Sequence, residues 1–223
     1  MTSLSSCSIP SLVGDRLLWD EKDFKDAFGD GKKCDFTLDA GNGLVLFEVV
    51  AHQITTATRI NLSRDAFDAD IEKSIMKKVR QLNAASECLL EGEAPLTGVR
   101  AGIQRPILPV VVVAMGFPYV EQVVSYIDEL IGHEQLLIDA RIAPLSILDF
   151  KELELVESQA GSGLDPATVL RRCQAETSRK ISFWNWATTR NPPIHRSERV
   201  SQDSTQVWQE IISRLQFPGA ESH

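Results

Sequence analysis

The sequence predicts an α/β protein in which a mixed β-sheet is flanked by helices. Three segments predict this fold class: a β-hairpin over residues 33–52, a long amphipathic helix over residues 63–90, and a buried strand at Pro106–Met115. Because a hairpin is followed by a helix and then by another strand, we expect mixed elements packed around one sheet. The 223 residues suffice for one large domain, or for a domain with a helical appendage.

The hairpin is the clearest local prediction. Two apolar runs, Cys34–Leu38 and Leu44–Ala51, flank the turn-forming segment Asp39–Gly43. A tight hairpin turn needs residues with positive φ, and an Asn-Gly pair is the usual source of them. We therefore expect Asn42 and Gly43 to make the turn between two antiparallel strands.

Helical patterns lie on both sides of this hairpin. A short helix is predicted at Asp20–Phe28, with Asp20 as its N-cap and Gly29 as its stop. After the hairpin, apolar residues recur at spacings of four, four and three, as one buried stripe of a helix requires. The members of this stripe are Ile71, Ile75, Val79 and Leu82.

The segment Pro106–Met115 is apolar without alternation, which predicts a strand buried on both faces. A helix at Val120–Ile131 follows. We then expect two short strands, one near Leu136–Ile138 and one near Ile142–Leu148.

The rest of the chain has a helical pattern. Asp149 and Glu152 have the spacing of a capping box, which predicts that a helix begins there. Proline at the first helical position favours a further helix from Asp165, and residues 202–215 suggest a last one. We place a soft domain boundary near residue 150, with a core at 1–150 and a helical C-terminal region at 151–223 that packs on it.

Bulk properties limit the function. A net charge of −8 and a pI near 5.1 argue against a protein that binds nucleic acid through its whole surface, but a local basic groove stays open. No apolar run reaches the roughly 18 residues of a membrane span. Four cysteines without CxxC spacing, and a start without the features of a secretory signal, predict reduced thiols and a cytoplasmic location. No zinc, nucleotide-binding or serine-hydrolase motif occurs.

Three carboxylates carry a resemblance to a known family. Asp35 lies in Cys-Asp-Phe at the start of the hairpin, Glu48 lies on its second strand, and Glu21 lies on the preceding helix. Over roughly residues 15–115, this order of elements resembles the core of the PD-(D/E)XK nuclease superfamily. The resemblance implies a restriction-endonuclease-like sheet and a metal-dependent nuclease in which Asp35, Glu48 and Glu21 hold Mg²⁺, a hard ion that prefers oxygen ligands.

The chain departs from that family's pattern at one position. The family's ExK tripeptide has a lysine where this sequence has Val50, which neither carries charge nor donates a hydrogen bond. His52 lies on the same face of the strand as Glu48, because side chains alternate with a period of two. The two expected substitutes for the lysine are therefore His52, or Lys73 or Lys77 on the long helix.

Each candidate also has a structural interpretation. Glu48 is the hardest to explain structurally, because it lies inside an apolar run where an ionised carboxylate is costly unless it is paired. Asp35 fits two roles equally well: a functional carboxylate, or a carboxylate at a strand end that accepts a backbone hydrogen bond. Glu21 and His52 also fit solvated positions at a helix and a strand exit. A solvated helix face would account for the following residues: Glu72, Lys73, Lys77, Lys78 and Arg80.

Three functions follow from these alternatives. The first is a degenerate nuclease-like domain used for nucleic-acid binding or protein assembly, in a bacterial defence or DNA-processing system. It is favoured by Val50, the acidic charge and the aromatic helical tail. The second is an active Mg²⁺-dependent nuclease that uses Asp35 and Glu48. The third is an interaction or immunity protein without a nucleic-acid role. Expected partners are accordingly DNA or RNA, or a protein, including a second copy of the chain.

Two features of the C-terminal region bear on this choice. The aromatic segment Phe183–Trp186 either stacks on bases or anchors the C-terminal helices to the sheet. The last third of the chain is also locally basic. These cations would either contact phosphate or balance the acidic charge of the rest of the protein. Its cationic residues include Arg171, Arg172, Arg179, Lys180, Arg190, Arg196 and Arg199.

Overall fold

Five strands form one sheet in the computed structural model, which describes residues 18–29, 34–50, 63–91, 105–113, 117–161 and 163–190. The strands follow one another across the sheet in chain order. They are β1 (Leu18–Asp20), β2 (Phe36–Asp39), β3 (Leu44–Val50), β4 (Ile107–Val113) and β5 (Ser146–Asp149). The predicted α/β class is thus confirmed, although β1 was not predicted.

The sheet is mixed, as expected. The first three strands pair antiparallel, whereas β3 pairs with β4, and β4 with β5, in parallel. The carboxyl ends of β3, β4 and β5 therefore lie at the same edge of the sheet as the start of β2. Polar groups near these strand ends are brought together at that edge, which is the usual place for a site in an α/β sheet.

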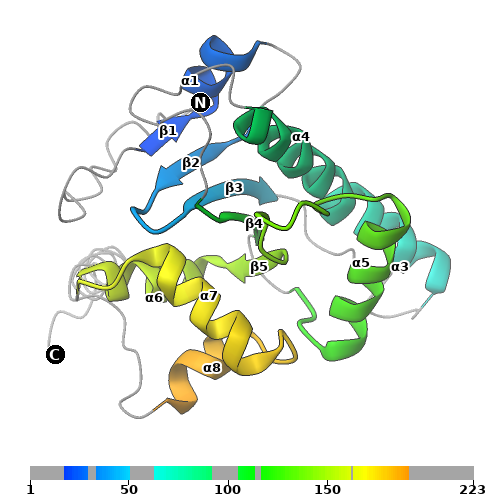
Figure 1. Ribbon diagram of the computed structural model, residues 1–223. Coiled ribbons are helices and arrows are strands. Elements are labelled where there is room, and N and C mark those ends of the chain that lie inside the picture. Colours follow the sequence, from blue (N-terminus) through cyan, green and yellow to red (C-terminus); the bar gives the residue numbers. More distant parts are fainter. Residues whose placement is uncertain are drawn as a thin grey trace, which may run out of the picture.

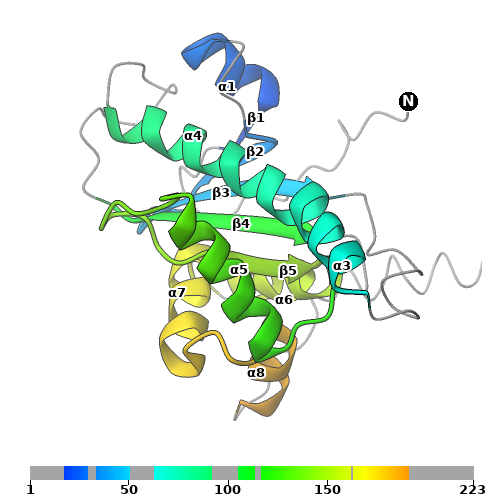
Figure 2. The ribbon, with the colours of Figure 1, turned by 90° about the vertical axis from the view of Figure 1, so that its right-hand side faces the viewer.

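Helices cover both faces of the sheet (Figure 1). They are α1 (Glu21–Phe28), α3 (Arg64–Ile71), η1 (Glu72–Met76), α4 (Lys77–Glu91), α5 (Glu121–His133), α6 (Phe150–Gly161), α7 (Pro166–Thr177) and α8 (Phe183–Thr189). Figure 2 shows α3, α4 and α5 on one face, and α6, α7 and α8 on the other. None of the described helices is long and apolar enough to cross a membrane.

The alternation of β3 divides the interior into two cores. Leu44, Leu46 and Val50 point toward α4 and pack with the stripe that includes Ile75 and Val79. The intervening side chains of β3 face the opposite way and pack with α6, α7 and α8. Since β4 is buried along its whole length, its unbroken apolar sequence is explained by a core on each face.

The long helix predicted over residues 63–90 is present but is not uniform. The side chain of Ser63 caps α3 by accepting a hydrogen bond from the backbone N–H of Ala66. The first N–H groups of a helix need such partners because they have none within the helix. The segment η1 is a π-helix, which leads directly into α4. Short π segments are inserted turns that are frequent near functional sites.

The hairpin is confirmed, but its turn differs from the prediction. Positive φ occurs at Gly41, at +82°, and Asn42 and Gly43 do not take that conformation. The backbone N–H of Gly41 donates to Asp39. The carboxylate of Asp39 also accepts hydrogen bonds from both terminal nitrogens of Arg105. Gly43 is favoured for a different reason, because a Cβ atom there would lie 3.0 Å from the backbone oxygen of Pro106 and 3.1 Å from Cβ of Ala167.

Other local predictions had mixed outcomes. The caps at Asp20 and Gly29, and the capping box of Asp149 and Glu152, are confirmed. The strand predicted near 136–138 is wrong, since these residues form a turn in which Leu137 has a φ of +55°. Of the strand predicted at 142–148, the last three residues lie in β5, and Ile142 makes an isolated bridge. The helix predicted at 202–215 lies outside the described residues.

Candidate functional site

The two hairpin carboxylates lie side by side. Phe36 pairs with Phe47 in the β2–β3 ladder, so the next step of the register brings Asp35 opposite Glu48. Glu48 belongs to the face of β3 that packs against α4, and its side chain is wholly buried. Asp35 lies just before β2 and is 28% exposed. The hairpin thus presents one buried and one accessible carboxylate toward the same helix.

A lysine of α4 meets both carboxylates. The Nζ atom of Lys78 lies 2.5 Å from Oε2 of Glu48 and 3.4 Å from Oδ2 of Asp35. Its side chain is only 19% exposed, so this ammonium group is largely withdrawn from water. The assignment of Lys78 to a solvated helix face was therefore wrong. The site combines two carboxylates and one cation from β2, β3 and α4.

The helical stripe explains why Lys78 points inward. Lys78 follows Ile75 by three residues and precedes Val79, so it lies at the border of the face that packs on the sheet. Lys73 and Lys77, the lysines expected to replace the missing one, are both exposed and make no recorded contact with either carboxylate. The periodic stripe in the sequence indicated which face of the helix is buried, but it could not separate Lys78 from Lys77 or Lys73.

Glu48 is held in an unusual electrostatic environment. Burial is the largest influence and raises the pKa of Glu48 from 4.5 to about 7, despite the opposing effect of Lys78. Burial would lower the pKa of Lys78, but its hydrogen bond to Glu48 and the charges of both carboxylates raise it instead. The cation therefore stays charged, while the glutamate titrates near neutral pH.

One oxygen of Glu48 is unused. Oε2 accepts the hydrogen bond from Lys78, but Oε1 is buried and has no hydrogen-bond partner in the part of the chain that the structure describes. An unpaired buried carboxylate oxygen costs free energy of about 1–3 kcal/mol or more. Most buried polar atoms in native folds are paired, so within the described fold this oxygen is a spare acceptor.

Asp35 is fixed in place by the neighbouring strand. Its Oδ2 atom accepts a hydrogen bond of 2.7 Å from the backbone N–H of Val49, the residue after Glu48. The same oxygen lies near Nζ of Lys78. The carboxylate is therefore oriented by the hairpin itself and does not depend on a flexible side-chain conformation.

Cys34 lies under this pair and is structural. Its Sγ donates to the backbone carbonyls of Phe36 and Phe47, which ties β2 to β3 just inside the two carboxylates. Burial, followed by the charge of Glu48, raises the pKa of the Cys34 thiol to about 12. A thiol held in its protonated form is a poor nucleophile.

The remaining predicted residues lie elsewhere. Glu21 is the first residue of α1 and is half-buried. The structure gathers no group of three or more metal-binding side chains in the described residues, so Glu21 does not join Asp35 and Glu48 in such a cluster. His52 lies outside the described residues.

The aromatic segment Phe183–Trp186 is mainly an anchor. Phe183 and Trp186 are buried in the core between the sheet and α6, α7 and α8, and the indole nitrogen of Trp186 donates to Glu176. Trp184 is the exception, because 39% of it is exposed. Only Trp184 of this segment is therefore free to stack on another molecule.

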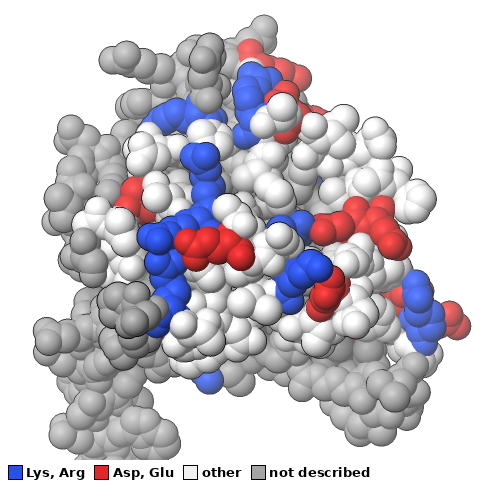
Figure 3. All heavy atoms as spheres, turned by 60° about the horizontal axis from the view of Figure 1, so that its bottom comes forward, with Lys and Arg blue, Asp and Glu red and all other residues white. Residues whose placement is uncertain are grey.

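Four of the basic C-terminal residues form ion pairs within the described fold, Arg171 is exposed, and Arg196 and Arg199 lie outside the described residues. The recorded ion pairs are Arg172–Glu176, Arg190–Glu176, Arg179–Asp128 and Lys180–Glu121. In Figure 3, which brings the underside of Figure 1 forward, a short strip of basic side chains has acidic ones against it. These cations balance acidic neighbours and do not form a uniform basic groove on the described surface.

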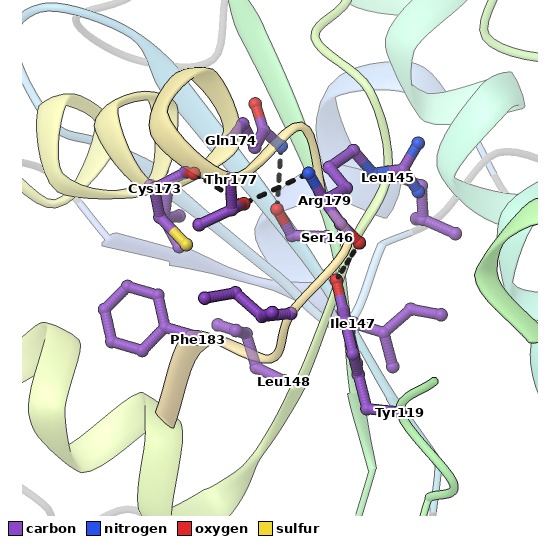
Figure 4. Close-up of a pocket in the computed structure, with 12 residues that line it drawn as sticks. Tyr119, Leu145, Ser146, Ile147, Leu148, Cys173, Gln174, Thr177, Arg179 and Phe183 are labelled. Atoms are coloured by element: carbon purple, nitrogen blue, oxygen red, sulfur yellow. Dashed lines mark hydrogen bonds between the residues drawn. The ribbon is translucent and has the colours of Figure 1, made fainter. Parts of the chain in front are cut away.

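A small hollow between β5, α7 and the start of α8 is closed by its own hydrogen bonds (Figure 4). Gln174 donates to the hydroxyl of Ser146, and the hydroxyl of Thr177 accepts from the backbone of Arg179. Tyr119 reaches across to the carbonyl of Arg179. The hollow reflects how α7 packs on the sheet and offers no cluster of reactive groups.

The chain matches no protein-family model, no curated protein and no solved structure. The candidate site is therefore defined by the geometry of Asp35, Glu48 and Lys78 alone.

Proposed function

We propose that this chain is a metal-dependent nuclease with a site of the PD-(D/E)XK kind, in which Lys78 replaces the lysine missing at Val50. The observation that supports it is the position of Lys78 Nζ, within 3.4 Å of an oxygen of each hairpin carboxylate. The degenerate interpretation relied in part on the absence of such a lysine, alongside the acidic charge and the aromatic tail. A lysine from α4 removes that objection.

The geometry allows this replacement. Val50 points to the same face of β3 as Glu48, the face covered by α4. A lysine at position 50 would therefore extend toward α4, and Lys78 approaches the same carboxylates from α4 in the opposite direction. The ammonium group of Lys78 therefore lies on the same side of the sheet as that of a lysine at position 50 would, although it comes from α4 and not from β3.

The donor set suits a hard divalent cation. Asp35 and Glu48 supply carboxylate oxygens, which Mg²⁺ prefers, and Oε1 of Glu48 has no other partner in the described fold. When bound there, Mg²⁺ would polarise a phosphodiester and lower the pKa of a bound water. Asp35 and Glu48 would hold the ion, and burial of Glu48 would limit competition from bulk water.

Lys78 has the role of a positioned cation in this proposal. Its ammonium group can donate to an attacking water and offset negative charge on the phosphate. Because the pKa of Lys78 is raised by its hydrogen bond and its two acidic neighbours, it stays protonated at neutral pH and does not act as a general base. The substrate class is accordingly a nucleic-acid backbone.

A degenerate domain for binding or assembly is the second candidate. It is favoured by the complete burial of Glu48, whose pairing with Lys78 also suits a purely structural ion pair. Such a domain would retain the nuclease-like core without hydrolysis. Its partner would be DNA, RNA or another protein.

The test is a cleavage assay with the full chain. Single- and double-stranded DNA and RNA are incubated with Mg²⁺, Mn²⁺ or EDTA, and wild type is compared with Asp35→Asn, Glu48→Gln and Lys78→Met. Lys77→Met, an exposed neighbour on the same helix, is the matched control. We expect metal-dependent cleavage by wild type and the control, and loss in the other three variants.

The other outcomes separate the alternatives. Cleavage that survives Asp35→Asn and Glu48→Gln would place the activity elsewhere in the chain. Salt-dependent binding without cleavage would support the degenerate domain. No affinity for any nucleic acid at low salt would leave an interaction or immunity protein.

A further inference from the structure

Lys78 already engages one oxygen of each carboxylate that a cation would need. Lys78 Nζ contacts Oε2 of Glu48 and Oδ2 of Asp35, so it lies between the two side chains. Oε1 of Glu48 is the unpartnered oxygen, but it is buried. A divalent ion that bridges Asp35 and Glu48 would therefore lie within a few ångströms of the Lys78 ammonium group, whichever oxygen of each carboxylate it uses.

We propose that Lys78 and a divalent cation compete for Asp35 and Glu48, so that filling the site requires Lys78 to move off both carboxylates. This inference rests on the proposed function, because it concerns the same metal site. It adds that the ammonium group of Lys78 occupies the site when no metal is bound. The affinity of the site for a divalent cation is thereby lowered when no substrate is present.

Electrostatics supports this competition. An ammonium group and a divalent ion within a few ångströms repel each other strongly in a partly buried site, where charges are weakly screened. The lysine side chain has several rotatable bonds and is 19% exposed, so its conformation can change without breaking the backbone of α4. Glu48 cannot withdraw in the same way, because it is fully buried within β3.

Movement of Lys78 would also place its ammonium group where it can act on the substrate. After release from the carboxylates, its ammonium group would still be tethered to α4 beside them. It would then be free to face a phosphate or a water. The same residue would thus block the empty site and serve the filled one.

The first test measures Mn²⁺ binding by electron paramagnetic resonance and calorimetry, with Mn²⁺ as the probe and no substrate. Wild type is compared with Lys78→Met, Lys78→Arg and Lys77→Met. We expect Lys78→Met to bind Mn²⁺ at least tenfold more tightly than wild type. Lys78→Arg and Lys77→Met should bind close to wild type, since the first keeps the charge and the second lies outside the site.

A second measurement needs no variant, and so is independent of whether Lys78→Met folds. Lysine methylation of the wild-type chain is followed by mass spectrometry with and without Mg²⁺. We expect Mg²⁺ to increase the modification rate of Lys78 severalfold and to leave Lys77 unchanged. An unchanged Lys78 rate at a saturating Mg²⁺ concentration would overturn the competition.

The outcomes distinguish this inference from the proposed function. If wild type binds Mn²⁺ and cleaves nucleic acid, but Lys78→Met binds no more tightly, the competition is refuted and the nuclease stands. If no form of the chain binds Mn²⁺ or cleaves, the proposed function fails, and the inference fails with it.

Discussion

Two buried glutamates, Glu48 beside α4 and Glu152 in the first turn of α6, show how similar residues can serve different ends. Burial is the largest influence on each and raises the pKa of both. Glu152 accepts backbone hydrogen bonds from Asp149 and Trp184, one at each oxygen. Glu48 has Lys78 at one oxygen and no partner within the described fold at the other.

The difference lies in how completely each carboxylate is satisfied. Glu152 joins the end of β5 to the starts of α6 and α8, so its hydrogen bonds account for its burial. Glu48 has a spare acceptor within the described fold, which a purely structural role does not require. A raised pKa alone therefore does not mark a site, whereas an unsatisfied oxygen beside a cation is more specific.

The largest expected effect on stability belongs to the Glu152 side of the molecule. Trp186→Ala should lower the free energy of unfolding by about 3–4 kcal/mol, because it removes a buried indole and its hydrogen bond to Glu176. Trp184→Ala, at a largely accessible position, should cost less than about 1 kcal/mol. Urea unfolding checks both. Equal losses would show that the whole segment packs uniformly.

Removing the Glu152 carboxylate should have the next largest effect. Glu152→Ala should destabilise the fold by about 2–3 kcal/mol, since it leaves the backbone N–H groups of Asp149 and Trp184 without acceptors. Lys151→Ala, an exposed neighbour, is the control and should change stability by less than about 0.5 kcal/mol. A loss below about 1 kcal/mol for Glu152→Ala would break the distinction between the two glutamates.

The pH dependence of stability should distinguish Glu48 in the metal-free chain. Its pKa is raised on folding, so its protonated form favours the folded state, and that contribution is lost as pH rises through about 7. Between pH 5 and pH 8, wild type should lose about 2 kcal/mol relative to Glu48→Gln. Thermal or urea unfolding at several pH values measures this difference. Parallel curves for the two proteins would contradict the raised pKa.

The smallest effects are expected at the exposed lysines of the long helix. Lys73→Ala should change the free energy of unfolding by less than about 0.5 kcal/mol and leave cleavage unaltered, because it lies on the outer side of the helix. Chemical denaturation and the cleavage assay are sufficient here. A large loss of cleavage would show that Lys73 takes part in the reaction.

Local signals predicted much of this fold. The hairpin, the capping box of Asp149 and Glu152, and the apolar strand β4 each depend on neighbours in the sequence, and the structure confirms them. Glu48 was recognisable because it interrupts an apolar run. Position-specific backbone geometry was harder, since the hairpin turn takes its positive φ at Gly41 and not at Gly43.

Lys78 could not be assigned from a local pattern. Its role depends on how α4 is rotated on β3, a tertiary contact between residues 30 positions apart. The buried stripe gives that rotation only to within one residue, so Lys73, Lys77 and Lys78 were not separable by pattern alone. The π-helical segment η1, just before Lys77, adds a change of helical phase that simple periodicity does not include.

The most direct test of the central claim is the rate of Mg²⁺-dependent cleavage by Lys78→Met against wild type and Lys77→Met, with folding verified by circular dichroism. The account predicts a decrease of about a hundredfold or more for Lys78→Met and little change for Lys77→Met. Cleavage by Lys78→Met at the wild-type rate would contradict it, because the cation between Asp35 and Glu48 would then have no part in the reaction.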